Sequence, residues 1–390
     1  MGDLISTLPE ELICHILSFL PTLEAVRTCV LSKRWKTLWR SVLTLYFDDS
    51  LTYKKEEHAR FVQSVSAAIF SQDQRQPIHK FRLKTYSNPA TVTVWVHAAV
   101  QLRVQHLDLS LSSQYVQHPP NLSSIFTCKT LLVLKLQGTK LEPISSVDLP
   151  FLKHLHLQDL RFSKRACLAE LLSGCPLLED FKAKRLDFHE DVTDREFKTL
   201  PNLLRAKISA RTDVFLLGVV SNVKFLHIDE IFFRFGEGTR PYIFPMFHNL
   251  THLELEYRCY NDNWSQVVEL LQHCPKLQVL VTNQPYFHQT KMNGINEEVG
   301  DWQYRRSDPE CILLHLKRCY LNDYRGTSGE FQFATYIMGN GRVLEKMRIR
   351  GGFSVNQLEE PKLFKELSSC TRCSTTCKLS FEGERDLREI

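Results

Sequence analysis

The central part of the chain repeats a pattern of large apolar residues, in the arrangement apolar-x-x-apolar-x-apolar. The nine instances are Ile78/Phe81/Leu83, Val104/Leu107/Leu109, Leu131/Leu134/Leu136, Leu152/Leu155/Leu157, Leu178/Phe181/Ala183, Leu203/Ala206/Ile208, Val223/Leu226/Ile228, Leu250/Leu253/Leu255 and Leu277/Leu280/Thr282. The last two members of each instance are two positions apart, with one residue between them, so they share one face of a β-strand. Consecutive instances lie about 20 to 27 residues apart, a spacing typical of solenoid repeats. The pattern predicts an α/β solenoid over residues 78–300, with parallel strands on its concave face and helices and loops on its convex face.

Two segments between these strands indicate helices that end at a proline. The frame Leu-Leu-x-x-Cys-Pro-x-Leu occurs at residues 171–178 and again at residues 270–277. Proline disfavours helix in the residue before it and has no N–H to donate, so each helix should end at the Cys-Pro step. Ala183, Ala206 and Thr282 replace the larger aliphatic residues usual in leucine-rich repeats, so the repeats are irregular. A helical pattern over residues 55–71 predicts a connecting helix within residues 51–77.

Three short helical patterns occupy residues 1–50. Apolar residues at helical spacing are Leu12, Ile13, Ile16, Leu17 and Leu20 in the first, Val26, Cys29 and Val30 in the second, and Trp35, Leu38 and Trp39 in the third. Pro9 and the acidic pair Glu10 and Glu11 suit a helix start, and Pro21 ends the first pattern. So small a unit cannot bury this much apolar surface alone, which predicts a binding partner. The alternative is that these residues only form an N-terminal helical core.

The order Leu8-Pro9, Ile16-Leu17, Leu20-Pro21 and Val30-Leu31-Ser32-Lys33-Arg34-Trp35 closely resembles the F-box. This module attaches a substrate adaptor to the Skp-type linker protein of a cullin–RING (SCF) ubiquitin ligase. The resemblance implies that the residues in contact with the linker are Leu8, Pro9, Leu12, Ile16, Leu17, Leu20, Pro21, Val30, Leu31 and Trp35. It also implies a cullin as a partner held through that linker.

A second resemblance covers residues 301–382. The segments Asp308–Leu316, Tyr324–Gly326, Ala334–Met338 and Val343–Ile349 are similar to the FBD domain found at the C-terminus of many plant F-box proteins. Their pattern predicts a strand, a turn at Arg325-Gly326, a helix around residues 331–338 and a strand ending at Ile349. We therefore expect an extension of the same type as the repeats, which closes the solenoid, and a tail over residues 383–390. Together the two resemblances indicate the plant F-box/FBD/leucine-rich-repeat family.

The concave face of the predicted sheet is the expected site for a target protein. Residues flanking the buried strand positions point to this face, and the candidates for target binding are His154, His156, Lys182, Lys184, Arg205, Lys207, His227 and His252. Four of these residues are lysine or arginine, so we hypothesise that they select an acidic or phosphorylated segment. The alternative is an ordinary solvated sheet face.

Composition narrows the class of protein. Of the 390 residues, 43% are hydrophobic, which indicates a folded chain. A net charge of +5 without a concentrated basic stripe argues against a nucleic-acid partner. No signal peptide and no run of apolar residues of membrane-spanning length are evident, so we expect no membrane partner and a location in the cytoplasm or nucleus. The 12 cysteines are then expected to be reduced thiols.

Few groups of residues have the spacing of a catalytic or metal-binding site. Cys370, Cys373 and Cys377 have the close spacing of metal ligands, but no second pair accompanies them. His154 and His156 share a strand face without a matched carboxylate. No nucleophile elbow or zinc-protease motif is present. We therefore predict no catalytic residues, no metal and no cofactor, and a chain that is not an enzyme.

These observations predict a substrate-recognition adaptor of an SCF ubiquitin ligase. The F-box would bind the Skp-type linker, and the repeats would hold a target protein that other subunits ubiquitinate. Two alternatives stay open: a receptor that senses a small molecule or inositol phosphate, and a scaffold that does not lead to degradation.

Overall fold

A computed structural model describes residues 8–50, 52, 54–73, 75–111, 118–190, 200–209, 215–231, 244–257, 264–284, 308–352 and 360–382. The chain folds into two compact units, Met1–Asn202 and Leu203–Ile390. The expected tail over residues 383–390 and the start of the expected FBD region, residues 301–307, lie outside the described residues.

Short helices form the first part of unit 1, as the sequence predicts. They are α1 (Glu10–Leu17), α2 (Thr22–Arg27), η2 (Thr28–Val30), α3 (Trp35–Leu38) and η3 (Trp39–Ser41). Pro9 and Pro21 have extended backbone conformations, and each directly precedes a helix. Their lack of an N–H costs nothing there, because the first N–H groups of a helix have no intrahelical acceptor.

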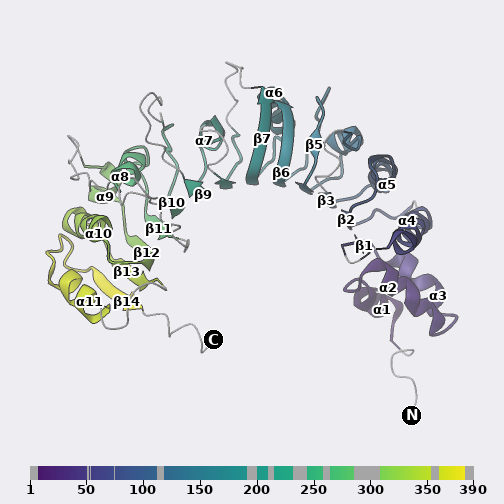
Figure 1. Cartoon of the computed structure of the whole chain (residues 1–390), viewed down its shortest axis with the longest axis horizontal. Helices are drawn as coiled ribbons and strands as arrows, with labels where there is room; N and C mark the ends of the chain where they lie inside the picture. The colour runs from purple at the N-terminus through teal and green to yellow at the C-terminus, as the bar shows by residue number, and fades with distance from the viewer. Residues whose placement is uncertain are drawn as a thin grey trace, which may run out of the picture. The chain divides into compact units, whose positions relative to one another are not determined.

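A parallel sheet follows in unit 1. Its strands are, in spatial order, β1 (Thr44–Asp48), β2 (Lys80–Thr85), β3 (His106–Leu111), β4 (Val133–Gln137), β6 (His154–Lys164) and β7 (Asp180–Glu190), and the short β5 (Lys140–Leu141) pairs with β6. The connections contain α4 (Lys55–Phe70), α5 (Pro89–Gln101), η5 (Ser123–Thr127) and α6 (Arg165–Ser173). The helices α4, α5 and α6 lie on one side of the strands, and the other side stays open (Figure 1). The strand residues on this uncovered side form what we call the open sheet face.

The sheet of unit 1 begins earlier than the sequence indicated. β1 lies within the segment expected to belong wholly to the helical F-box, and its Leu45 and Phe47 are buried. Leu45 pairs in register with Phe81, and Phe47 with Leu83, on β2. The backbone N–H of Tyr46 donates to the Thr22 hydroxyl at 2.7 Å. The first strand of the sheet is therefore fastened directly to the N-terminal helices.

Unit 2 has the same construction. Its strands are β8 (Arg205–Ser209), β9 (Phe225–Ile231), β10 (His252–Tyr257), β11 (Val279–Asn283), β12 (Arg318–Tyr324), β13 (Lys346–Gly351) and β14 (Lys378–Glu382), all paired in parallel. Its helices are α7 (Phe215–Val219), α8 (Ser265–Gln272), α9 (Glu310–Leu314), α10 (Ser328–Asn340) and α11 (Glu360–Ser369). The α/β repeat architecture predicted from the apolar pattern is confirmed in both units.

The apolar pattern identifies the core correctly. The second and third members of all nine predicted instances are buried, including the small residues Ala183 and Ala206 and the polar Thr282. Each fully buried leucine or phenylalanine contributes about 1.5–3 kcal/mol relative to an exposed one. The stability of each unit thus comes mainly from ladders of leucines between the sheet and its helices.

Both Cys-Pro steps end a helix, as predicted. α6 ends at Ser173 and α8 at Gln272, and the cysteine that follows each helix is buried. The Cys175 thiol donates to the carbonyl of Leu171 at 3.1 Å, and the Cys274 thiol donates to that of Leu270 at 3.3 Å. Cysteine here is a small buried residue that satisfies one of the free carbonyl groups at the end of a helix.

The C-terminal region continues the same strand–helix repeat. β12, the turn at Gly326 (φ +76°), α10 and β13 occupy the places that the sequence predicts. The structure adds α11 and β14, so the extension contributes one more repeat than the pattern indicated. Leu379 and Phe381 of β14 are only half-buried, so within the described residues this strand is an edge of the core rather than its cover.

A capping box holds the start of α10. The Glu330 carboxylate is buried and accepts from the backbone N–H groups of Arg325 (2.9 Å) and Thr327 (3.1 Å), while the Thr327 hydroxyl accepts from the Glu330 N–H. We predict that Glu330→Ala lowers the stability of this helix by about 2–3 kcal/mol, because two N–H groups lose their acceptor. Hydrogen exchange of the α10 amides measures the loss. The exposed Glu345→Ala is the control and should change stability by less than about 0.5 kcal/mol; equal losses in the two variants would contradict the prediction.

Candidate functional site

The N-terminal helices expose a set of large apolar side chains. The exposed members are Leu12, Ile16, Phe19, Leu20, Val30 and Leu31, with Val30 at 84% and Phe19 at 74% of full exposure. Pro9 and Pro21 are also exposed, and Leu8 is half-buried. Leu12 and Ile16 are four residues apart on α1, so they lie on the same face of the helix. We call these six exposed residues the apolar docking set.

Two residues that the F-box resemblance assigns to the linker contact are buried within the chain. Leu17 is 1% exposed and Trp35 is 4% exposed. The physical reason is the helical period: Ile13 and Leu17 form a buried stripe on α1, while Leu12 and Ile16, one residue earlier, form the exposed one. Leu17 and Trp35 therefore hold the helices together and support the docking surface from within.

Phe19 is a large exposed apolar residue that the sequence interpretation did not include among the linker-binding candidates. It follows the last turn of α1, and its ring meets the ring of His15 edge-on at 4.9 Å. It lies beyond the helix, so helical spacing alone could not assign it to a face. The only signal was a bulky aromatic residue directly before Leu20-Pro21.

The basic cluster near residue 34 contributes to this region in a different way. An amino group of the Arg34 guanidinium donates to the carbonyl of Leu8 at 2.6 Å, and its Nε lies 3.8 Å from the Glu10 carboxylate. These contacts fasten the start of α1 to the start of α3. Lys33 and Lys36 remain exposed on the surface.

The candidate target-binding residues of unit 1 lie on the open sheet face. His156 pairs in register with Lys182, and Gln158 pairs with Lys184. Lys182 is exposed, Lys184 is half-buried, and His154 lies half-buried in the row of Asp180. The His156 ring contacts the Asp180 carboxylate at 3.0 Å. Hydrogen bonding to His156 and the charge of Lys182 outweigh burial and hold the pKa of Asp180 below its ordinary value.

The candidate residues of unit 2 divide into two groups. Arg205 is exposed, and His252 stacks on the ring of Phe225 at 4.7 Å between centroids. The sequence predicts that Lys207 and His227 are accessible to a target, but both side chains are engaged within the chain. Lys207 lies 3.2 Å from the Asp229 carboxylate, and His227 is only 6% exposed.

A compact polar cluster surrounds His227. One ring nitrogen, Nδ1, lies 3.0 Å from the Glu254 carboxylate, while Nε2 contacts Asp229 and lies 3.5 Å from Glu256. Burial opposes protonation of the ring, but hydrogen bonds to Asp229 and Glu254 outweigh it and raise the pKa of His227. Burial alone would raise the pKa of Asp229, but its contacts with His227 and Lys207 outweigh burial and hold this pKa below the ordinary value. This arrangement joins two of the predicted residues to three carboxylates.

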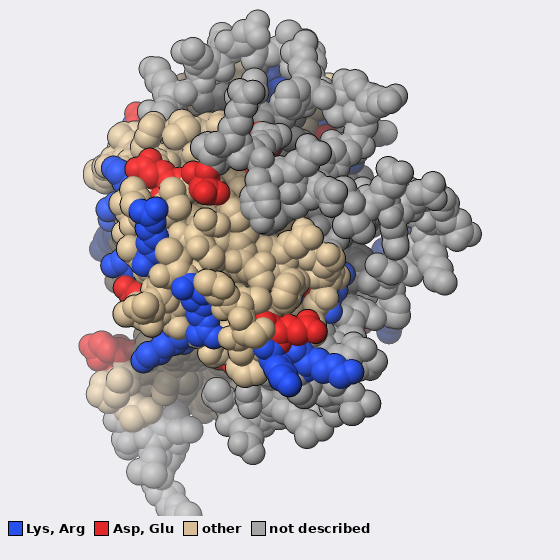
Figure 2. All heavy atoms as spheres, turned by 90° about the vertical axis from the view of Figure 1, so that its left-hand side faces the viewer, with Lys and Arg blue, Asp and Glu red and all other residues tan. Residues whose placement is uncertain are grey.

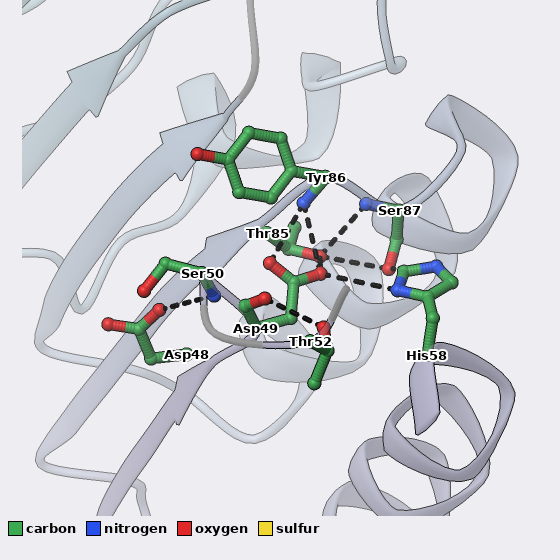
Figure 3. A network of polar contacts seen from close by, with 8 residues as sticks. All are labelled: Asp48, Asp49, Ser50, Thr52, His58, Thr85, Tyr86 and Ser87. Carbon is green, nitrogen blue, oxygen red and sulfur yellow. Dashed lines mark hydrogen bonds and ion pairs between the residues drawn. The ribbon is translucent and has the colours of Figure 1, made fainter. Parts of the chain in front are cut away.

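A Ser–His–Asp arrangement in unit 1 has a structural role. The buried Asp49 accepts from the Thr85 hydroxyl at 2.7 Å and from the Tyr86 N–H at 3.0 Å, and His58 lies between Asp49 (3.6 Å) and Ser87 (3.5 Å) (Figure 3). Ser87 is itself buried, and the cavity beside Thr85 and Ser87 has a volume of about 10 Å³, enough for one water molecule. The network joins the end of β1, α4 and the end of β2.

The cysteines resemble core residues more than ligands. Among the described residues all eleven cysteines are unpaired with one another, and burial raises the pKa of Cys175, Cys311 and Cys319 to about 12. The predicted grouping of Cys370, Cys373 and Cys377 does not gather its three thiols at one point in the described part of the chain.

Charged side chains are spread over the face of the molecule shown in Figure 2. Figure 2 shows lysine and arginine side chains in small groups, with aspartate and glutamate among them and uncharged residues between. Over the described residues, no helix has both the length and the apolar character needed to cross a membrane.

Comparison with known proteins defines the class to which this chain belongs. The F-box domain family matches residues 5–46, the FBD family matches residues 303–349, and the leucine-rich repeats of "FBD-associated F-box protein At5g56370" match residues 92–193. The chain is therefore an F-box protein with leucine-rich repeats and an FBD region.

Relatives from Arabidopsis thaliana match along nearly the whole chain. "F-box/FBD/LRR-repeat protein At4g00160" is 30% identical over 97% of this chain and 94% of its own length, and "F-box/FBD/LRR-repeat protein At4g26340" is 30% identical over 97% and 100%. "Putative F-box/FBD/LRR-repeat protein At5g22670" is 28% identical over 97% and 98%. A solved structure, "Crystal structure of TLR13-ssRNA13 complex", aligns with a TM-score of 0.35 at 12% identity, over 82% of this chain and 48% of that chain. On the sequence matches, the chain belongs to the F-box/FBD/LRR-repeat protein family.

Proposed function

We propose that this protein is a substrate-recognition adaptor of an SCF-type cullin–RING ubiquitin ligase. The observation that carries the proposal is the apolar docking set on a family-matched F-box. Six large apolar side chains stay exposed on or directly beside the F-box helices, while Ile13, Leu17, Ala25, Trp35, Leu38 and Trp39 are buried. Exposed apolar residues in such a number mark an interaction site, and the F-box family implies the Skp-type linker as the partner and the cullin beyond it.

The repeats would hold the target protein on the open sheet face. In unit 1, Lys182 and Lys184 occupy adjacent rows of this face, which suits an acidic or phosphorylated segment. Arg205 offers a further exposed cation in unit 2. Lys207 contributes less to this hypothesis, because Asp229 already neutralises much of its charge.

The chain itself would carry out no chemical step. Its contribution to catalysis would be proximity, since a tethered target meets the ubiquitin-loaded conjugating enzyme at a high effective concentration. The ligase operates in the cytoplasm or nucleus, and we place this protein there. Members of its family with F-box and leucine-rich repeats are typically non-enzymatic adaptors.

Affinity purification from plant cells with the proteasome blocked tests the proposal. The full chain should recover the linker and the cullin together with ubiquitinated proteins, and Lys182→Glu with Lys184→Glu should lose the ubiquitinated proteins while keeping the linker. Recovery of linker and cullin with no ubiquitinated protein would favour a non-degradative scaffold. A target bound only after an anionic metabolite is added would favour a small-molecule receptor, and failure to recover the linker would overturn the proposal.

A further inference from the structure

The cluster around His227 has the composition of a metal site. Three of its side chains, His227, Asp229 and Glu256, each place a ligand atom within 4.8 Å of the others, and this is the one such group of three among the described residues. His227 and Asp229 are buried, and Glu256 is half-buried at the rim. None of the three is needed for the contacts of the apolar docking set, which belong to unit 1.

The geometry of two strands creates this convergence. Lys207 on β8, His227 on β9 and Glu254 on β10 are register neighbours in one row across the sheet of unit 2. Beyond Leu255 the register between β9 and β10 shifts, so that two residues of β9, at positions 229 and 230, oppose the single Glu256 of β10. Such a bulge redirects side chains at the end of a strand. Here it brings Glu256 to the same ring nitrogen that Asp229 already faces.

We propose that His227, Asp229 and Glu256 form a binding site for a divalent transition-metal ion of the zinc class. Imidazole Nε2 and two carboxylate oxygens are a known donor set for Zn²⁺, and a fourth position would be open to water or to a group of a bound partner. This site is independent of linker docking, and it gives the sheet of unit 2 a ligand of defined chemistry.

Glu254 supplies the supporting contact that such a site requires. A histidine that binds metal through one nitrogen usually donates its other N–H to a carboxylate, which fixes the orientation of the ring. The Nδ1 of His227 lies 3.0 Å from Glu254, on the side of the ring opposite to Nε2. Glu254 in turn accepts from the Asn283 amide at 3.3 Å, and Asn283 accepts from the Asn322 amide at 2.8 Å. His227 is thus held in an orientation that directs Nε2 at the two carboxylates.

A second observation at the same place supports a ligand. Ser209 on β8 is the register neighbour of Asp229, and it is 1% exposed. Its hydroxyl has no hydrogen-bond partner among the described residues. A buried hydroxyl without a partner is unfavourable unless water or a ligand satisfies it. A water molecule bound to the metal would satisfy this hydroxyl.

In the metal-free state, protons and Lys207 take the place of the cation. The Nζ of Lys207 lies 3.2 Å from Asp229, and both ring nitrogens of His227 face carboxylates. Metal binding displaces the proton from Nε2 to the solvent and moves the Lys207 ammonium away from Asp229. Lys207 is 40% exposed, so its long side chain can turn into water.

Isothermal titration calorimetry of the chelator-treated full chain with Zn²⁺ at neutral pH tests the site. All variants carry Cys373→Ser, because Cys373 is an exposed thiol that could bind Zn²⁺ by itself. We expect one Zn²⁺ per chain with release of protons, measured by comparing buffers of different ionisation enthalpy. Ca²⁺ and Mg²⁺ should bind far more weakly, because both prefer oxygen-only sites.

Matched variants separate the site from general effects. His227→Gln and Glu256→Gln should each weaken Zn²⁺ binding at least tenfold, whereas His156→Gln, at the His156–Asp180 pair that lacks a third ligand, should leave it unchanged. Glu254→Ala should weaken binding by about 10–100-fold, and Glu254→Gln, which keeps an oxygen acceptor, should recover most of it. Lys207→Met removes the competing cation and should tighten binding several-fold.

Circular dichroism confirms that each variant is folded, and Glu256 at the half-buried rim keeps the test valid if His227→Gln unfolds unit 2. The proposal is wrong if the parent chain binds no Zn²⁺ at micromolar concentrations. It is equally wrong if Glu256→Gln and Lys207→Met bind Zn²⁺ as the parent does, or if Ca²⁺ binds as tightly as Zn²⁺. Loss of Zn²⁺ binding with the linker still recovered would leave the proposed adaptor function intact.

Discussion

Replacing Ile16 and Val30 together by aspartate should weaken binding to the Skp-type linker about a thousandfold and leave the chain folded. Both residues are exposed members of the apolar docking set, at 46% and 84% of full exposure. Loss of an anchor residue at the centre of an interface costs about 2 kcal/mol or more, and two such losses give about 4 kcal/mol, or roughly a thousandfold. Aspartate adds a charge that the complex would have to desolvate. Biolayer interferometry with purified linker measures the affinity.

Val94→Asp is the matched control for that experiment. Val94 is about half-exposed on α5, outside the F-box, and it is apolar and β-branched like the residues replaced. Its substitution should change linker affinity by less than twofold. If Val94→Asp reduced binding as much as the double variant, or if the double variant bound normally, the apolar docking set would not be the linker site.

Trp35→Ala should destabilise the F-box by about 3–5 kcal/mol, because it empties the centre of a small core. Trp35 is buried, as are Ile13, Leu17 and Leu38, and α1 contacts α3. Linker binding should fall as well, but through loss of the folded helices and not through loss of a contact. Hydrogen exchange should show the amides of α1 and α2 losing protection while those of β3 and β4 keep theirs.

The contrast with the surface variant makes this prediction specific. Leu17→Ala should behave like Trp35→Ala, at about 2–5 kcal/mol, whereas the Ile16 and Val30 variant should keep protection in α1. Unchanged exchange in Trp35→Ala would show that the tryptophan lies outside the core. Lower temperature should restore part of the linker binding of Leu17→Ala and none of that of the surface variant.

The repeat architecture was accessible from sequence because it depends on local periodicity. An apolar pair such as Leu107 and Leu109 marks a strand with one buried face, and the Cys175-Pro176 step marks the end of a helix; the structure confirms both. Strand β1 escaped prediction because its short apolar pair, Leu45 and Phe47, directly follows the helical pattern. It becomes a strand only by pairing with β2, some 35 residues further along the chain.

The sites were harder to derive because they depend on contacts between distant residues. Helical spacing placed Ile16 and Leu17 in the same apolar helix, but only the packing of the helices decides that Leu17 faces inward. The cluster at His227 requires the register of three strands and a bulge beyond Leu255. The strand pattern directs His227, Asp229, Glu254 and Glu256 to one face of the sheet, but it does not show that Asp229 and Glu256 converge on one ring nitrogen of His227.

β1 contacts both the N-terminal helices and the repeats, so the position of each strand in unit 1 fixes its distance from the N-terminal helices. Parallel strands lie about 4.8 Å apart, so the five steps from β1 to β7 span about 24 Å measured from the docking module. The Asp49 network in Figure 3 links the end of β1 to the end of β2 and to α4, and so stabilises the first of these strand pairs. Under the proposed function, a target bound at β3 and one bound at β7 would present different lysines to the same conjugating enzyme, so the choice of strand would also select the site of ubiquitination.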